Sequence, residues 1–178
     1  MRIIAGKYKG RRINAPDLVP TRPTTDFAKE GLFNILQNQW DLTEVSFLDL
    51  FCGTGNISYE MASRGCTDIT SVDLFDGCVK FVTSMIDKLK IEGMQVIKSN
   101  VLDFIKTETA QYDLIFAGPP YALEQLKLLP DLILEHKMLK PKGWFMLEHN
   151  PNHNFDKHPN FIHKRHYGST NFSIFSPK

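Results

Sequence analysis

The chain has 178 residues, of which 42% are hydrophobic, which is typical of one domain with a buried core. Its formal net charge of +1 does not indicate a polyanionic partner, and no apolar run is long enough for a membrane span or a signal peptide. The three cysteines, Cys52, Cys66 and Cys78, form no CxxC pair and no even disulfide framework, so we expect free thiols. These features predict one soluble, cytoplasmic, monomeric domain over residues 1–178, without membrane contact.

The first predicted element is a β-hairpin over residues 1–16 that turns between Gly6 and Gly10 and ends at Pro16. Basic residues precede the first acid, Asp17, and recur near the other end of the chain. They are Arg2, Lys7, Lys9, Arg11, Arg12, Arg22, Lys157, Lys164 and Arg165. Basic residues at both ends predict a local phosphate-binding face, with an ordinary solvated surface as the alternative.

A proline-punctuated connector over residues 16–23 leads to a helix that Thr24 or Thr25 can cap. Gly31 lies inside this helix, where glycine is less favourable than alanine by about 1 kcal/mol. Apolar residues at helical spacing predict the buried face, and they are Phe27, Leu32, Phe33, Ile35 and Leu36.

From residue 45 onward, predicted strands alternate with predicted helices. The strands are expected at 45–51, 68–74, 94–100, 112–117 and 143–149, and the helices at 56–65, 77–90, 101–106 and 123–138. Residues 161–176 predict a hairpin that turns near Gly168. Alternation of this kind predicts an α/β fold with a mainly parallel sheet and an antiparallel C-terminal hairpin. In such sheets the ligand binds at the carboxyl ends of the strands.

The segment DLFCGTGNIS follows the first core strand and predicts a cofactor loop. Gly53 and Gly55 allow a sharp turn close to a ligand, although a tight strand–helix turn without a ligand is the alternative. The third glycine of a dinucleotide fingerprint is absent. Asp49, just before the glycines, would repel a pyrophosphate and attract a cation. S-adenosylmethionine, with its sulfonium and α-amino groups, meets that requirement.

Two further polar residues end neighbouring predicted strands. Asp73 can accept hydrogen bonds from ribose hydroxyls, with helix capping or a surface position as the alternative. Asn100 can bond the adenine edge, ahead of Asp103 as a candidate, or it can be a simple turn residue. The predicted cofactor site combines these two residues with the glycine loop and their neighbours. It consists of Asp49, Phe51, Gly53, Thr54, Gly55, Asp73, Asn100 and Val101.

The apolar run YDLIFA ends in Gly118-Pro119-Pro120-Tyr121, which predicts an acceptor loop. Two consecutive prolines keep the chain stiff and extended, so this loop can hold a backbone carbonyl in a fixed direction. The ring of Tyr121 can stack on a flat base. A linker without a site is the alternative, which the position directly after a buried strand disfavours.

These motifs together resemble the bacterial small-subunit ribosomal RNA guanine-N2 methyltransferases, a family with the Rossmann-like fold of class I S-adenosylmethionine-dependent enzymes. The resemblance covers MRIIAGKYKGRRI, TRPTTDFAKEGLFNIL, LDLFCGTGNISYEMASRG, SVD, YDLIFAGPPY and YGST. It implies methylation of the exocyclic N2 amine of guanine, in free small-subunit RNA or in a ribosomal particle. It also implies RNA contacts by Arg11 and Arg12 of the basic hairpin, and by Arg22, Thr24 and Thr25 near the acceptor pocket. For these last three residues, capping and anchoring of the helix is an equal alternative.

Gly118 departs from the pattern of this family. The family motif is DPPY or NPPY, whose first side chain and first proline carbonyl accept hydrogen bonds from the target amine. Glycine keeps the carbonyl of the loop but has no side-chain acceptor. Loss of one preorganised polar group lowers a rate by roughly 10²–10³, so we expect normal cofactor binding and weak or absent methylation. Aspartate and glycine codons can differ by one base, so a single-base change is another origin of Gly118.

Three other classes of function remain as alternatives. An RNA- and cofactor-binding protein without catalysis follows if Gly118 abolishes activity. An adenine-N6 or cytosine-N4 DNA methyltransferase would use the same loop, but 178 residues leave little room for a target-recognition segment. A nucleotide-dependent oxidoreductase is disfavoured by the missing third glycine. We expect no metal site at Glu148, His149 and His153, because their spacing follows no common zinc pattern.

Overall fold

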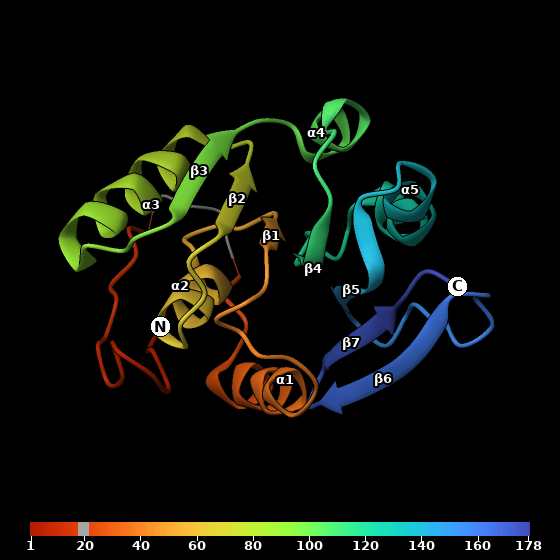
Figure 1. Cartoon of the computed structure of the whole chain (residues 1–178), viewed down its shortest axis with the longest axis horizontal. Helices are drawn as coiled ribbons and strands as arrows, with labels where there is room; N and C mark the ends of the chain where they lie inside the picture. The colour runs from red at the N-terminus through yellow and green to blue at the C-terminus, as the bar shows by residue number, and fades with distance from the viewer. Residues whose placement is uncertain (18–21) are drawn as a thin grey trace.

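The computed structural model describes residues 1–17 and 22–178, so half of the connector at 16–23 lies outside the described residues. One sheet organises the molecule, with strand order β3-β2-β1-β4-β5-β7-β6 (Figure 1). Strands β1 to β5 are parallel, and β7 runs antiparallel to both β5 and β6. The strands are β1 (Phe47–Leu50), β2 (Ile69–Asp73), β3 (Met94–Lys98), β4 (Tyr112–Ala117), β5 (Leu139–His149), β6 (Phe161–Tyr167) and β7 (Thr170–Phe175). The Rossmann-like class and the antiparallel C-terminal hairpin are confirmed.

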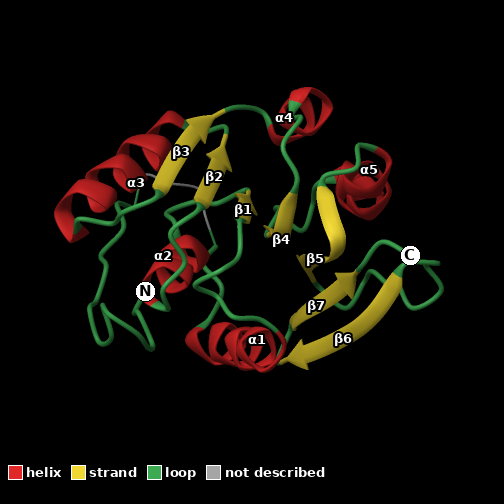
Figure 2. Ribbon diagram, in the orientation of Figure 1, coloured by secondary structure: helices red, strands yellow, loops and turns green. Residues whose placement is uncertain are grey.

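Helices cover both faces of this sheet (Figure 2). They are α1 (Asp26–Gln39), α2 (Asn56–Ser63), α3 (Asp76–Leu89), α4 (Val101–Thr107), the 3₁₀ helix η1 (Glu124–Leu128) and α5 (Leu129–Glu135). Consecutive residues of one strand face opposite sides, as Leu114 packs with α1 to α3 and Ile115 with α4 and α5. This two-sided burial explains why the central strands are apolar throughout. Among the described residues, no helix is long and apolar enough to cross a membrane.

The N-terminal segment forms the short antiparallel hairpin that the sequence predicts, although its arms are too short to form regular strands. The arms pair through the bridge between Arg2 and Arg12 and through backbone hydrogen bonds, among them Ile3 to Arg11 at 3.0 Å and Ile13 to Met1 at 2.9 Å. Other amides of the segment bond α2: those of Ile4 and Ala5 donate to the Glu60 carboxylate, at 2.9 and 3.2 Å. The Lys7 amide donates to the Ser63 carbonyl at 2.7 Å. Docking on α2 therefore adds to the pairing of the two arms.

A buried charge cluster fixes this arrangement. Glu60 is fully buried and forms ion pairs with Lys29 of α1, at 3.2 Å, and with Arg64, at 2.9 Å. The Lys29 ammonium also donates to the Arg2 carbonyl and to Asn56. Burial lowers the pKa of Lys29 even though Glu60 opposes this change. Since each buried charge is paired and hydrogen-bonded, the cluster connects α1, α2 and the N-terminal segment.

Two expectations about helices are wrong in part. The helix predicted at 123–138 is divided into η1 and the shorter α5, because Pro130 in the first turn of α5 has no amide to continue a regular ladder. β5 consequently begins at Leu139, earlier than predicted. Phe27 was expected on the buried face of α1 but is 66% exposed and meets the Tyr167 ring edge to face.

Gly31 has a steric reason for its place inside α1. A Cβ at this position would lie 2.1 Å from the Tyr167 ring. The aromatic side chain from β6 therefore occupies the space that any larger residue of α1 would need, and this close approach joins the helix to the edge of the sheet.

Candidate active site

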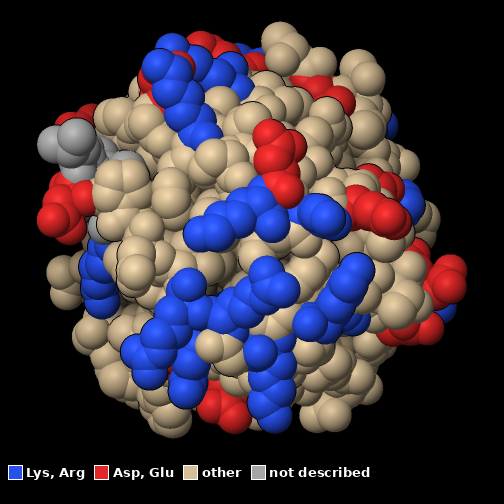
Figure 3. All heavy atoms as spheres, turned by 90° about the vertical axis from the view of Figure 1, so that its left-hand side faces the viewer, with Lys and Arg blue, Asp and Glu red and all other residues tan. Residues whose placement is uncertain are grey.

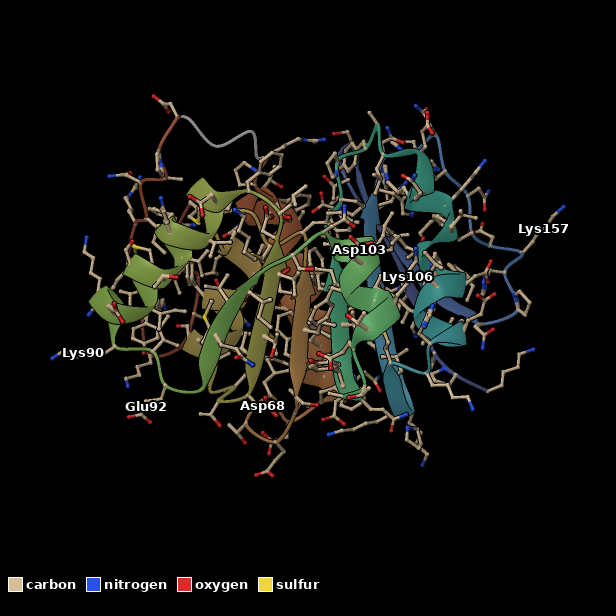
Figure 4. The ribbon with its side chains drawn as sticks, turned by 90° about the horizontal axis from the view of Figure 1, so that it is seen from above. Asp68, Lys90, Glu92, Asp103, Lys106 and Lys157 are labelled. Carbon is tan, nitrogen blue, oxygen red and sulfur yellow. The ribbon has the colours of Figure 1, made fainter. Side chains whose placement is uncertain are left out.

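A cleft of about 550 Å³ opens at the carboxyl ends of the parallel strands. Figure 4 shows Asp68 and Glu92, which precede β2 and β3, at the opposite edge of the sheet. The cleft is lined by the segments that follow β1, β2, β3 and β4, together with Arg22, Pro23 and Thr24 before α1. Most of the predicted cofactor residues line it, namely Asp49, Phe51, Gly53, Thr54, Asp73, Asn100 and Val101.

Gly55 is the one predicted cofactor residue that does not line the cleft. It is the N-cap of α2, with a left-handed φ of 93°, and a Cβ there would lie 2.5 Å from the Tyr59 ring. Glycine at this position therefore shapes the loop from behind, while Gly53 and Thr54 face the cleft.

Asp49 is the most deeply buried acid of the cleft, with 1% of its surface exposed. Its carboxylate accepts a 2.6 Å hydrogen bond from the Ser58 hydroxyl, which also contacts Ser71. Burial raises the pKa of Asp49 to about 7, against the opposing effect of the Ser58 hydrogen bond. A bound cation beside this carboxylate would stabilise its ionised form.

Asp73 and Asn100 both have structural roles, but not the ones expected as alternatives: Asp73 is buried and does not cap α3, and Asn100 is the N-cap of α4 rather than a simple turn residue. Asp73 accepts hydrogen bonds from the amides of Gly53, at 2.8 Å, and Phe75, at 3.0 Å, and so holds the glycine loop against the start of α3. Asn100 caps α4 by accepting from the Leu102 and Asp103 amides. Both side chains nevertheless line the cleft, whereas Asp103 does not. These hydrogen bonds therefore fix two side chains at the mouth of the pocket.

The acceptor loop faces the cofactor loop across the same cleft. Gly118 follows β4 directly, and its amide donates to the Leu50 carbonyl of β1 at 3.2 Å. All four residues of the Gly118–Tyr121 motif line the cleft. The Arg22 guanidinium lies 4.6 Å from the centre of the Tyr121 ring, so one face of that ring is already covered.

Glu148 also lines the cleft, although the sequence motifs did not predict it to belong to the site. It lies near the end of β5 with 6% of its surface exposed, and it accepts hydrogen bonds from the hydroxyls of Thr24 and Tyr121. Burial raises its pKa, while Thr24, Tyr121 and Arg22 oppose this change. An acid directly after the apolar run Trp144–Leu147 was the signal that could have identified it. No metal cluster forms there or elsewhere in the described ranges.

Of the remaining predicted RNA contacts, Thr24 also lines this cleft, whereas Arg11, Arg12 and Thr25 do not. Arg12, Thr24 and Thr25 line a neighbouring hollow of about 520 Å³. Thr25 also caps α1 by accepting from the Ala28 amide. Arg11 lies over the Tyr8 ring, 5.7 Å from its centre. Lysine and arginine side chains gather on the face of the molecule that holds α3 and the N-terminal segment (Figure 3).

The C-terminal basic residues do not join this face. Lys157 lies at the opposite edge of the molecule from Lys90 of the α3 end (Figure 4). Lys164 is partly neutralised by Asp156, at 3.5 Å. The expectation of one face built from both ends is therefore wrong, because the β6–β7 hairpin extends the sheet away from the N-terminal segment.

Comparison with known proteins places the chain in a family. The sequence model of the family described as Conserved hypothetical protein 95 matches residues 1–176. The chain belongs to this family. Relatives named Ribosomal RNA small subunit methyltransferase D come from Buchnera aphidicola, 31% identical over 83% of this chain and 75% of the relative, and from Haemophilus influenzae, 32% identical over 83% and 78%. The family is therefore one of methyltransferases.

Solved structures agree with this assignment. The yhhF protein of Escherichia coli superimposes with a TM-score of 0.87, covering 100% of this chain and 98% of that one at 24% identity. A 16S rRNA N2 methyltransferase of Thermus thermophilus, in complex with AdoMet and guanosine, gives a TM-score of 0.71 at 20% identity over 90% of this chain and 45% of that one. These similarities establish the methyltransferase fold.

Proposed function

We propose that the protein transfers a methyl group from S-adenosylmethionine to the exocyclic N2 amine of a guanine in small-subunit ribosomal RNA. The observation that carries this proposal is one cleft that is lined both by the cofactor residues, including Asp49 and Asp73, and by the Gly118–Tyr121 loop. The relatives are named for small-subunit ribosomal RNA, and the motif resemblance indicates guanine N2. A ribosomal substrate would place the enzyme in the cytoplasm.

The residues of the cleft fit S-adenosylmethionine in charge and polarity. Asp49 would face the positively charged amino acid part, and the Asp73 carboxylate has free lone pairs for ribose hydroxyls. Asn100 uses its oxygen to cap α4, so its amide NH₂ group is left for the adenine edge. Phe75 and Val101 supply apolar lining for the adenine ring. When bound, the cofactor supplies an electrophilic methyl group on a sulfonium.

The chain itself would contribute mainly positioning. The rigid Pro119–Pro120 segment would hold the backbone carbonyls that accept hydrogen bonds from the target amine. Tyr121 and Arg22, packed on each other, would form the wall of the acceptor pocket. These groups would hold the amine nitrogen so that its lone pair is directed toward the electrophilic methyl group.

Methyl transfer to nucleosides tests the proposal. Purified protein is incubated with labelled S-adenosylmethionine and either free small-subunit RNA or small-subunit particles from cells lacking the enzyme, and the digested RNA is separated by nucleoside. We expect label in N2-methylguanosine, and none with Asp73→Ala, whose cofactor loop has lost its anchor. Label confined to methyladenosine or to DNA would overturn the guanine assignment. Cofactor binding without label in any substrate would leave the non-catalytic binding protein as the function.

A further inference from the structure

We propose that Glu148 is the side-chain acceptor for the target amine, in the role that residue 118 fills in the resembling family. This inference rests on the proposed function and adds to it a catalytic residue and a reason for guanine specificity. Because the neighbouring strand supplies this acceptor, the pocket has a side-chain acceptor even though residue 118 is glycine.

Glu148 lies directly beside Gly118 in the sheet. Ala117 of β4 pairs with Leu147 of β5, and Gly118 and Glu148 are the next residues along these parallel strands. Adjacent strands are about 4.8 Å apart, and residues at paired positions direct side chains to the same face. Both residues line the same cleft. The Glu148 carboxylate is therefore one strand away from the place where an acceptor at position 118 would project.

Gly118 leaves the space next to this carboxylate open. Apart from the chain neighbours, a Cβ at 118 would meet among the described residues only the Phe116 ring, at 3.1 and 3.6 Å. A carboxylate at 118 would also place a second negative charge beside a buried one, and close like charges raise each other's pKa. Glycine at 118 and glutamate at 148 are thus mutually compatible.

The contacts of Glu148 orient it without using all its acceptor capacity. One oxygen accepts from the Thr24 hydroxyl and the other from the Tyr121 hydroxyl, at 3.0 Å. An ionised carboxylate has about four lone-pair sites, so each oxygen keeps one. Guanine presents two adjacent donors, N1–H and N2–H, that match two carboxylate oxygens. Adenine presents one amino donor beside the N1 lone pair, which a carboxylate repels.

The surroundings of Glu148 also suit proton acceptance. The groups that face it are Arg22 and Thr24 from the segment before α1, Tyr121 after β4, and the Asp49 carboxylate of β1. In the transfer step the amine lone pair forms the nitrogen–carbon bond. The carbon–sulfur bond breaks with its electron pair left on sulfur, which becomes a neutral thioether. The proton that the nitrogen releases passes to the Glu148 carboxylate and then to water.

A double-mutant cycle tests this inference on the full-length protein. Glu148→Gln keeps the size of the side chain but removes its charge and one acceptor oxygen, and Gly118→Asn introduces an amide acceptor on the adjacent strand. We expect Glu148→Gln to lower kcat about 10²-fold, by analogy with the loss of an oxyanion-hole donor. Cofactor Kd and thermal midpoint should remain close to wild type. Glu135→Gln, at an exposed position of α5, is the matched control and should leave kcat unchanged.

The second arm separates an acceptor from a structural residue. Gly118→Asn should change wild-type kcat less than tenfold but raise it more than tenfold in the Glu148→Gln background. A structural role for Glu148 would not be rescued from position 118. If Glu148→Gln keeps kcat within threefold of wild type, the inference is overturned and the proposed function stands. The same conclusion follows if the wild-type protein is inactive and Gly118→Asn alone makes it methylate RNA. No methylation by any variant would overturn the proposed function and this inference together.

Discussion

Asp49 shows how burial, together with the nearby Asp73 and Glu148 carboxylates, can make cofactor affinity depend on pH. Its carboxylate is removed from water and has a single hydroxyl donor, so its ionised form is disfavoured and its pKa is raised to about 7. A cationic ligand needs the ionised form. At pH values below 7, binding must therefore displace a proton from Asp49, and affinity should weaken as the pH falls.

Titration calorimetry of S-adenosylmethionine binding checks this prediction. Between pH 7.5 and pH 6 we expect the Kd to rise roughly eightfold, which is the proton competition for one group with a pKa near 7. Asp49→Asn has no proton to displace and should bind more weakly with a flatter pH profile. An unchanged slope in Asp49→Asn would show that another group, such as Glu148 or the ligand amine, causes the dependence.

At the scale of elements, two glycines of the N-terminal segment allow the energetic effect of backbone strain to be distinguished from that of docking on α2. Gly6 and Gly10 have nearly the same left-handed φ, 83° and 84°. A Cβ at Gly6 would lie 1.9 Å from the Ser63 carbonyl oxygen, whereas one at Gly10 would meet nothing within 4 Å. Only Gly6 is therefore required by contact with α2, to which the amide of the next residue, Lys7, also donates.

Urea unfolding of the two alanine variants measures this difference. Gly10→Ala should lower the free energy of unfolding by about 1–2 kcal/mol, the price of a left-handed alanine. Gly6→Ala should lower it further, because the clash with backbone atoms forces the segment away from α2. Equal losses in the two variants would contradict the docking explanation and would leave backbone strain as the whole effect.

At the scale of the whole molecule, positive charge on one face favours a polyanion there. The side-chain charges of Arg11 and Arg12 are exposed in the N-terminal segment. Arg165 is exposed on β6, the edge strand farthest from β3, and Lys157 is exposed shortly before that strand. Two basic residues can thus be replaced by glutamate at either of these places, with the same change in net charge. Only the first lies on the face where basic side chains gather.

RNA binding by paired charge reversals checks which face is used. Arg11→Glu with Arg12→Glu should weaken binding of small-subunit RNA at least tenfold and reduce its salt dependence, since phosphate contacts are lost. Cofactor affinity should not change. Lys157→Glu with Arg165→Glu alters the net charge equally and should have a smaller effect. A larger loss from the second pair would place the RNA on the β6–β7 edge.

Local sequence signals predicted most of the fold. The apolar runs, the Gly168 turn and the Thr25 cap correspond to strands, a hairpin and a helix start in the structure. Because parallel strands end at one edge of the sheet, the polar residues after them could also be predicted to meet. Asp49, Asp73, Asn100 and the Gly118–Tyr121 loop do line one cleft.

Other features depended on partners that are distant in the sequence. The N-terminal arms had suitable strand patterns, but their docking on α2 depended on the Glu60 carboxylate, which accepts from the Ile4 and Ala5 amides. Glycine at position 31 is unfavourable inside a helix. The reason for it is the close approach of the Tyr167 ring, which comes from β6. Glu148 gained its place in the cleft only because β5 lies beside β4 and brings it next to Gly118.

The sequence by itself determined the order of strands and helices and the cofactor and acceptor loops, because periodicity and turn chemistry are local properties. Only the tertiary structure decided which charges are buried together and which strand supplies the carboxylate beside Gly118. Those outcomes follow from strand order and register, which bring together residues such as Thr24, Tyr121 and Glu148 that lie far apart along the chain.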